Sequence, residues 1–226
     1  MLFKKKSKPI ESDFTFDAEA NIDAFTNHIE KYIGTPDRVY HQIVSDRVHI
    51  DIHVVKATDS KPFHTLVTTG MSDREMSVPK NHESLRYAEL CLSLPKEWPL
   101  EKDALNDEKH YWPIRWLQIL ATLPFENNTW LGLGHTIGNG EPPAPFADNT
   151  KLCAVLIGMP LLHNQEFWEF SLNKKKTINF YSIIPIYKEE LELKNMAGFD
   201  GLIDQFERYN INELLDINRI NTCTNR

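Results

Sequence analysis

Apolar residues recur three or four positions apart in four stretches of the chain, which is the spacing of one face of an α-helix. In the first stretch Ile22, Phe25 and Ile29 fall on one such face, and Asp17 is suited to cap its start. Gly34 and the proline two residues later end the pattern. The spacing predicts helices over residues 18–33, 112–123, 188–194 and 199–209.

Other stretches favour strands because they are apolar at every second position or throughout. Over residues 85–94, Leu90 and Leu92 alternate with Glu89 and Ser93, so we expect the leucine face to meet the core. The patterns predict strands over residues 38–44, 48–55, 64–69, 85–94, 152–159, 166–172 and 178–187, and a glycine-, asparagine- and proline-rich loop over 127–150.

Strands therefore occur in groups, with helices before, between and after them. Polar turns at residues 45–46 and 173–176 join neighbouring strands. This order predicts an α+β domain with a mixed, largely antiparallel central sheet flanked by helices. No internal repeat or low-complexity linker divides the sequence, so we expect one domain over residues 1–226, with mobile ends at 1–16 and 220–226.

Composition narrows the class of protein. The 226 residues are 41% hydrophobic and 25% charged, which suits a folded chain with a sizeable core. The net charge of −7 argues against a nucleic-acid partner and favours a basic protein partner. No apolar run approaches the roughly 18–20 residues that span a bilayer, and the basic start lacks the apolar segment of a secretory signal. We therefore expect a cytoplasmic protein without a membrane partner.

The clearest candidate metal ligands are His49, Asp51 and His53, which alternate along a predicted strand and therefore share one face. Two imidazoles and a carboxylate are suitable ligands for zinc or non-haem iron. Successive side chains on one face of a strand stand about 7 Å apart, however, and converge poorly on an ion. Because Ile50 and Ile52 supply an apolar face opposite, the pattern favours a solvated outer face.

The glycines between residues 132 and 140 match neither the Walker nor the Rossmann spacing, and prolines follow where a helix would have to start. His135 in this stretch is the best single candidate for a functional histidine, against the alternative of a hydrogen-bonded structural one. No GxSxG elbow is present, and Cys91, Cys153 and Cys223 form no CxxC pair. We therefore expect no enzyme activity, no cofactor and no bound metal.

Several short segments together resemble the suppressor of fused domain family. They are residues 68–72 (TTGMS) with Met76, 87–90 (YAEL) with 92–95 (LSLP), 116–117 (WL) with 120–121 (LA) and Pro124, and 134–137 (GHTI) with 139–140 (NG). Their order and spacing agree with the family pattern from about residue 22 to residue 187.

The resemblance implies a mixed α/β domain, similar to the N-terminal domain of suppressor of fused, with no known catalytic activity. Animal members grip an extended peptide of a transcription factor in a cleft between two domains, and we expect this sequence to be too short for the second domain. The bacterial members that it resembles are stand-alone domains, several of which are thought to be immunity proteins or antitoxins that bind a cognate toxin.

The leading hypothesis is therefore a non-catalytic protein-binding domain, an immunity protein or antitoxin that neutralises a cognate toxin with a basic domain. One alternative is a metal-dependent hydrolase that uses His49, Asp51 and His53, or His135. Another is a regulatory adaptor that binds an extended peptide at a sheet edge. The sequence does not predict the oligomeric state.

The expected contact surface comprises the loops at residues 69–79 and 134–145, because loops on a rigid scaffold commonly carry binding residues. The candidate partner contacts in these loops are Met71, Asp73, Met76 and His135.

Overall fold

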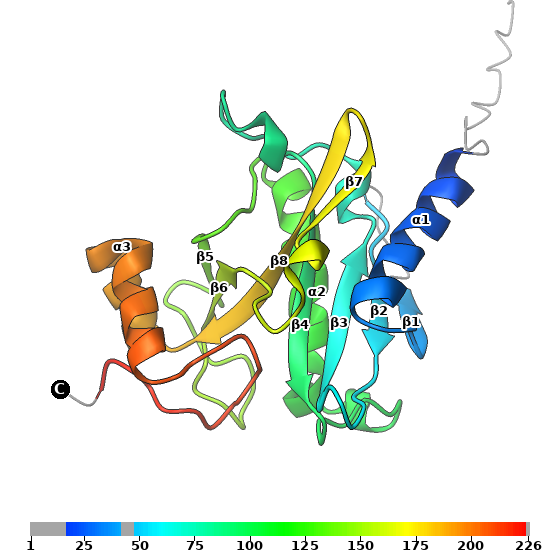
Figure 1. The fold of residues 1–226 in the computed structure, drawn as a ribbon. Coiled ribbons are helices and arrows are strands. Elements are labelled where there is room, and N and C mark those ends of the chain that lie inside the picture. The colour runs from blue at the N-terminus through cyan, green and yellow to red at the C-terminus, as the bar shows by residue number, and fades with distance from the viewer. Residues whose placement is uncertain (1–16, 42–47, 225–226) are drawn as a thin grey trace, which may run out of the picture.

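The computed structural model of the chain describes residues 17–41 and 48–224 (Figure 1). Its helices are α1 (Asp17–Tyr32), α2 (Glu108–Glu126) and α3 (Lys188–Arg208). Its strands are β1 (Arg38–His41), β2 (Asp51–Val55), β3 (Phe63–Thr69), β4 (Ala88–Pro95), β5 (Thr136–Gly138), β6 (Ala154–Gly158), β7 (Glu169–Asn173) and β8 (Lys176–Ile186). Short 3-10 turns are η1 (Met71–Asp73), η2 (Glu83–Leu85), η3 (Ala104–Asn106) and η4 (Gln165–Phe167).

The strands form one sheet in the order β1-β2-β3-β4-β8-β6-β5, and β7 pairs with β8 beside this path. Among the described strands every pairing is antiparallel except that of β4 with β8, which is parallel. The predicted hairpin around residues 173–176 is confirmed as the β7–β8 pair. The α+β class and the mixed, largely antiparallel sheet are confirmed as well.

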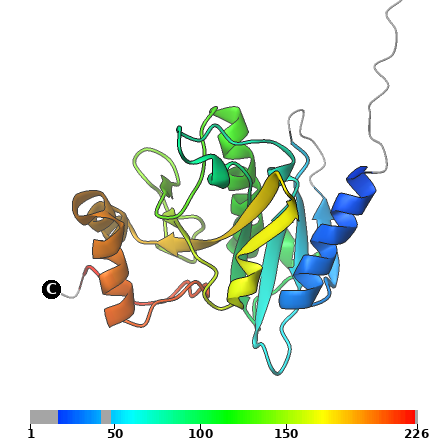
Figure 2. The ribbon, with the colours of Figure 1, turned by 45° about the horizontal axis from the view of Figure 1, so that its top comes forward.

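Helices cover both faces of the sheet because its central strands are apolar on both sides. On one face α2 packs against β4, where Trp112 and Leu120 share a core with Leu90. On the other face α1 lies near β3 and β4, where Ile29 shares a second core with Cys91. A third core joins α3 to β6 and β8, at the far end of the sheet from α1 (Figure 2). The sheet is thus the middle layer of the molecule.

Strand β4 differs from the expectation drawn from its alternating pattern. Leu90 and Leu92 do meet the core, as predicted, but Glu89, Cys91 and Ser93 on the opposite face are buried too. The reason is that β3 and β8 pair with β4 on its two sides, while α1 and the segment after α3 cover its second face. The polar residues that alternate with the leucines in β4 therefore do not form a solvent-exposed face.

The helices were predicted better than the loops. The expected helix at residues 112–123 lies inside the longer α2, and the helices at 188–194 and 199–209 both lie in α3, separated by the non-helical Gly198. The long loop at 127–150 contains β5, a strand too short to leave a hydrophobic pattern. In the part of the chain that the structure describes, no helix is both long and apolar enough to cross a membrane.

The C-terminal segment is held in place where the sequence suggested mobility. Thr222 is buried, and its N–H and hydroxyl donate to Glu190 Oε1 at 3.1 and 3.0 Å. Arg219 donates to both oxygens of the same carboxylate, at 2.7 and 2.5 Å. These hydrogen bonds connect the C-terminal segment to α3, while residues 1–16 and 225–226 lie outside the described part.

Candidate functional site

Two loops that are distant in the sequence meet beside the end of α2 through Trp130. The centroid of its indole lies 4.4 Å from the ring of His135 and 6.0 Å from the ring of His82. The loop before β4 lies above the end of α2 in Figure 1. Ser77 N–H in this loop donates to Thr129 O at 3.0 Å, and this hydrogen bond connects the loop to the segment after α2. Residues 129–131, between α2 and β5, thus contact both the loop before β4 and His135.

The accessible residues of these loops form what we call the two-loop surface. Its members are Glu75, Val78, Lys80, Glu83, Arg86, Trp130, Leu133 and His135. A hollow of about 400 Å³ opens in this surface, lined by the backbone and side chains between residues 75 and 86. Leu133 is 46% exposed and Trp130 is half-buried, so this surface presents apolar side chains as well as charged ones.

The four contact residues expected from the sequence differ in accessibility. Met71 is fully buried and Met76 is 4% exposed, so both side chains belong to the core. The sulfur of Met76 accepts the N–H of Leu131 at 3.4 Å, which links the two loops from inside. Asp73 is exposed at the end of η1, and His135 is half-buried. Burial removes the two methionines from the candidate contacts, and Asp73 and His135 remain predictions.

The surroundings of His135 keep its imidazole neutral. Burial lowers its pKa, the positive charge of Lys194 lowers it further, and a hydrogen bond with Trp130 partly offsets both effects. The imidazole is therefore neutral near pH 7. Among the described residues it does not belong to the group of clustered metal-ligating side chains. The arrangement offers a flat, neutral ring beside the Trp130 indole.

The recognisable segment at residues 68–72 is held by a buried carboxylate. Thr68 Oγ1 donates to Glu89 Oε2 at 2.7 Å, and the N–H and hydroxyl of Ser72 donate to Glu89 Oε1 at 2.9 and 2.7 Å. Burial raises the pKa of Glu89 to about 7, although these three donors act in the opposite direction. The network fastens η1 to β4, so this motif has a clear structural role.

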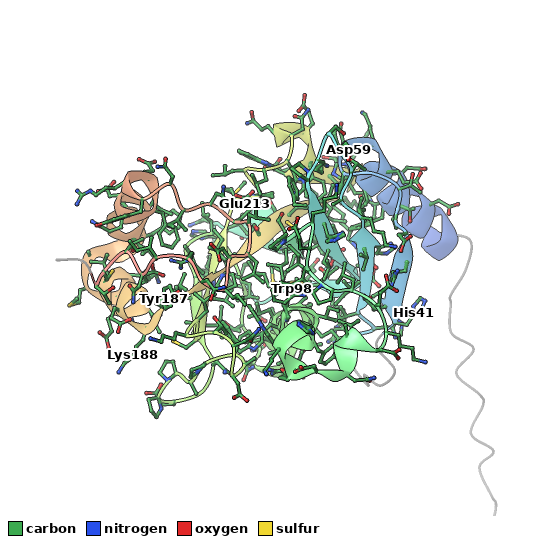
Figure 3. All side chains as sticks on the ribbon, turned by 90° about the horizontal axis from the view of Figure 1, so that it is seen from below. His41, Asp59, Trp98, Tyr187, Lys188 and Glu213 are labelled. Carbon is green, nitrogen blue, oxygen red and sulfur yellow. The ribbon has the colours of Figure 1, made fainter. Side chains whose placement is uncertain are left out.

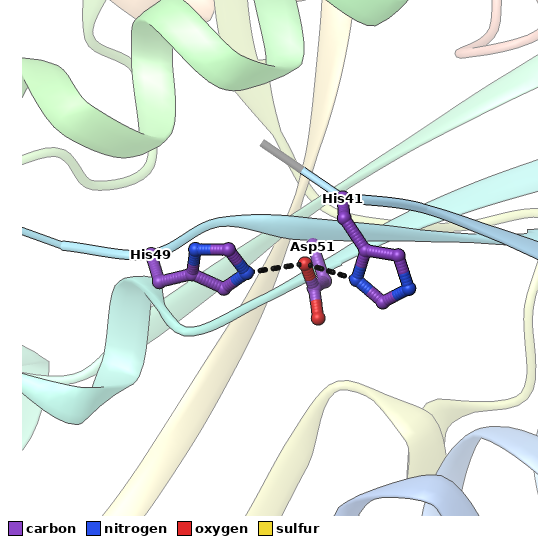
Figure 4. Close-up of side chains that lie close together, drawn as sticks. All are labelled: His41, His49 and Asp51. Atoms are coloured by element: carbon purple, nitrogen blue, oxygen red, sulfur yellow. Dashed lines mark hydrogen bonds and ion pairs between the residues drawn. The ribbon is translucent and has the colours of Figure 1, made fainter. Parts of the chain in front are cut away.

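A second candidate site lies at the β1 edge of the sheet, where His41, His49 and Asp51 converge (Figure 4). His41 Nδ1 lies 2.9 Å from Asp51 Oδ1, and His49 Nε2 lies 3.0 Å from the same oxygen. The side chains of His41 and His49 are 66% and 61% exposed, whereas that of Asp51 is 24% exposed. One carboxylate oxygen is therefore shared by two accessible imidazoles.

His53 does not belong to this group, contrary to the predicted set of ligands. One of its ring nitrogens, Nε2, lies 3.2 Å from Thr69 Oγ1, while Nδ1 is buried with no hydrogen-bond partner among the described residues. His41 takes its place because it is paired directly with Asp51 across β1 and β2. Paired residues on adjacent strands have Cβ atoms about 5 Å apart, closer than the roughly 7 Å between same-face neighbours on one strand.

Other reactive groups are poorly placed for chemistry. Cys91 and Cys153 are buried free thiols, and burial raises the pKa of each, so both stay protonated.

A hollow of about 430 Å³ lies beside Tyr187 and Lys188 at the start of α3. Figure 3 shows these two residues on the opposite side of the molecule from His41.

Comparisons with known proteins agree with this architecture. The family model described as Suppressor of fused protein (SUFU) matches residues 46–220. A SUFU homologue from Neisseria gonorrhoeae FA 1090 has a TM-score of 0.64 and 17% identity, and the match covers 90% of this chain and 95% of that one. The structure of a Sufu–Fu complex has a TM-score of 0.60 and 15% identity, with 90% and 91% of the two chains covered.

Drosophila Suppressor of Fused has a TM-score of 0.58 and 14% identity, and the match covers 91% of this chain but 51% of the fly protein. No curated protein matches the sequence. At these identities the solved structures show the fold, and the family model spans well over half of the residues. This chain belongs to the suppressor of fused (SUFU) family.

Proposed function

We propose that this chain is a cytoplasmic protein-binding domain that neutralises a toxin protein by tight, non-covalent association, as an immunity protein or antitoxin. The observation that carries the proposal is the two-loop surface, which presents Trp130 and Leu133 together with charged side chains. Family membership supports it, because one of the similar structures is a complex of Sufu with Fu. The buried thiols of Cys91 and Cys153, which form no disulfide bond, agree with a reducing compartment such as the cytoplasm.

The composition of the two-loop surface is that of a protein interface. Tryptophan and arginine are the residues most enriched among those that dominate binding energy, and the surface contains Trp130 and Arg86. Trp130 also contacts the ring of His135, which restricts its motion before a partner arrives. A restrained aromatic side chain loses less entropy on binding, so it is a good anchor.

The net charge of −7 supports a basic partner. Opposite charges accelerate the encounter of two proteins, and salt screens this attraction. We therefore expect the association rate to fall as the salt concentration rises, while the dissociation rate changes less.

The test uses the protein encoded by the adjacent gene, purified separately and titrated with this chain by calorimetry. We expect a dissociation constant in the nanomolar range and rescue of cells that express the neighbouring protein. If the neighbouring protein is harmless to cells that lack this chain, the immunity role is wrong.

Two variants locate the interface. Leu133→Glu and Trp130→Ala should each weaken binding by at least about tenfold, since anchor residues typically account for 2 kcal/mol or more. Lys102→Ala is the matched control, because Lys102 is exposed before α2 whereas Trp130 follows it. The 19 residues of α2 separate these ends by about 28 Å. Equal binding by all three variants would place the interface elsewhere.

The regulatory adaptor is the second candidate, because β1, β5 and β7 are edge strands of the sheet. These strands have only four, three and five residues, so an added peptide strand would form few main-chain hydrogen bonds. Such a complex would bind with micromolar affinity, in contrast to the nanomolar affinity expected for the toxin. The same titration therefore separates the two candidates.

A further inference from the structure

We propose that His41, His49 and Asp51 form a binding site for Zn²⁺ at the β1 edge of the sheet. This site is separate from the two-loop surface, which adjoins β5 at the other edge. The inference does not depend on the proposed function, because metal uptake is measured without a protein partner.

The distances suit one small ion. Zinc–nitrogen and zinc–oxygen bonds of about 2.0–2.1 Å in a tetrahedral shell place ligand atoms about 3.3 Å apart. Here Asp51 Oδ1 lies 2.9 and 3.0 Å from the nearest nitrogens of His41 and His49, and all three ligand atoms lie within 4.8 Å of one another. Small rotations of two exposed imidazoles would therefore complete the geometry.

The backbone holds the three ligands in this arrangement. Strand pairing places His41 directly opposite Asp51, and Asp51 is in turn paired with Thr69 of β3. The chain at His49 passes so close to Gly70 that a Cβ on this glycine would lie 2.0 Å from His49 O. Two of the ligands therefore come from paired strands and the third from the segment just before β2, which reduces the entropy that binding would cost.

The ligand set selects a class of ion. Imidazole suits zinc and its transition-metal neighbours, whereas calcium and magnesium prefer shells made only of oxygen. Three protein ligands leave one position of a tetrahedral shell for water. The alternative is that His41 and His49 only form hydrogen bonds with the Asp51 carboxylate. This alternative predicts no selective uptake of zinc.

The experiment titrates tag-free protein with ZnCl₂ by calorimetry, with MgCl₂ and CaCl₂ in parallel. We expect one equivalent of Zn²⁺ and no uptake of the other two ions. His41→Gln and His49→Gln should each weaken zinc binding by at least about tenfold, because even residues that only support a ligand commonly contribute that much. His82→Gln, a substitution of another exposed histidine, should bind as the unmodified chain does.

The variant His53→Gln distinguishes this ligand set from the one expected from the sequence, which was His49, Asp51 and His53. His53→Gln should leave zinc affinity within about threefold of the original, whereas it would be as damaging as His49→Gln if His53 were a ligand. Thermal unfolding gives an independent measure, since an ion that binds only the folded chain raises Tm. Zinc should raise the Tm of the unmodified chain and of His82→Gln, but not that of His41→Gln.

Two results would overturn the proposal. One is the absence of zinc uptake by the unmodified chain, and the other is equal uptake by His41→Gln and His49→Gln, which would place the ion elsewhere. Both histidines are largely exposed, so these variants keep the fold, and circular dichroism checks that they do.

Discussion

Glu89 brings an ionisable group into the middle of the sheet, and this makes stability depend on pH. Burial raises its pKa from 4.5 to about 7. A carboxyl whose pKa is higher in the folded chain stabilises the fold below its unfolded pKa, and this contribution is lost as pH rises through the folded value. The unmodified chain should therefore lose about 3 kcal/mol relative to Glu89→Gln between about pH 4.5 and pH 8.

Urea unfolding of both proteins across this pH range measures the difference. Glu89→Gln keeps the size of the side chain and removes the ionisation, so other carboxyl groups cancel in the comparison. Parallel stability curves for the two proteins would contradict the assignment of the pH dependence to Glu89.

Position 70 requires glycine because of its backbone conformation and because the backbone of His49 lies next to it. Its φ of 99° is unfavourable for other residues, and a Cβ would collide with the backbone of His49. Gly70→Ala should therefore lower the free energy of unfolding by at least about 2 kcal/mol. Gly198→Ala is the control, because Gly198 has a φ of 80° but no atom within 4 Å of a Cβ. Its φ of 80° and ψ of −177° also favour glycine, so this substitution should cost about 1–3 kcal/mol in the same urea titration, from backbone conformation alone and without the collision at residue 70.

The histidine cluster illustrates what the sequence could and could not predict about the candidate site. His49 and Asp51 were identified because alternation places them on one face. The predicted two-residue turn at 45–46 would pair His41 with Ile50, whereas the actual register pairs it with Asp51. A shift of one residue turns a side chain to the other face of the sheet, so His41 could not be found without the register.

At the scale of elements, the Glu190 carboxylate joins the start of α3 to the C-terminal segment. Glu190 is fully buried and the side chain of Arg219 is 7% exposed, so removing Arg219 leaves a buried charge without its partner. Arg219→Met should therefore destabilise the chain by about 3–5 kcal/mol. Adding Glu190→Gln to this variant should restore a large part of the loss, as measured by urea unfolding.

Lys188→Met provides the matched comparison on the same helix. Its exposed ion pair with Glu192 is 3.8 Å long and spans one helical turn. Exposed pairs of this kind contribute about 0.5 kcal/mol or less. Similar losses for Lys188→Met and Arg219→Met would mean that the buried pair does not hold the segment.

Elements with a complete hydrophobic repeat were predictable, and elements defined by long-range pairing were not. The helical spacing in α1 and the polar turn between β7 and β8 are local signals, and both were interpreted correctly. The burial of Ser93 depends on a bridge to Leu214, and β5 exists because it pairs with β6. Such contacts leave no local pattern, and Trp130 was missed for the same reason.

At the scale of the whole molecule, the sheet consists of two antiparallel parts. Strands β1 to β4 form one part from consecutive segments, and β5 to β8 form the other. The parallel pairing of β4 with β8 joins them. The histidine cluster lies at the outer edge of the first part, whereas the two-loop surface takes residues 75–86 from the loop before β4 and residues 130–135 from the loop before β5, so it draws on both parts. The two sites share no residue.

The parallel pairing of β4 with β8 has a consequence for the synthesis of the chain on the ribosome. Strands β1 to β4 can pair with one another as soon as they emerge, but the second edge of β4 has to wait for β8. Because β4 is buried along almost its whole length in the finished fold, the nascent chain exposes an apolar strand edge throughout this interval. Unpaired edges of this kind promote aggregation, so the chain is most in need of chaperone protection before residue 186 has been translated.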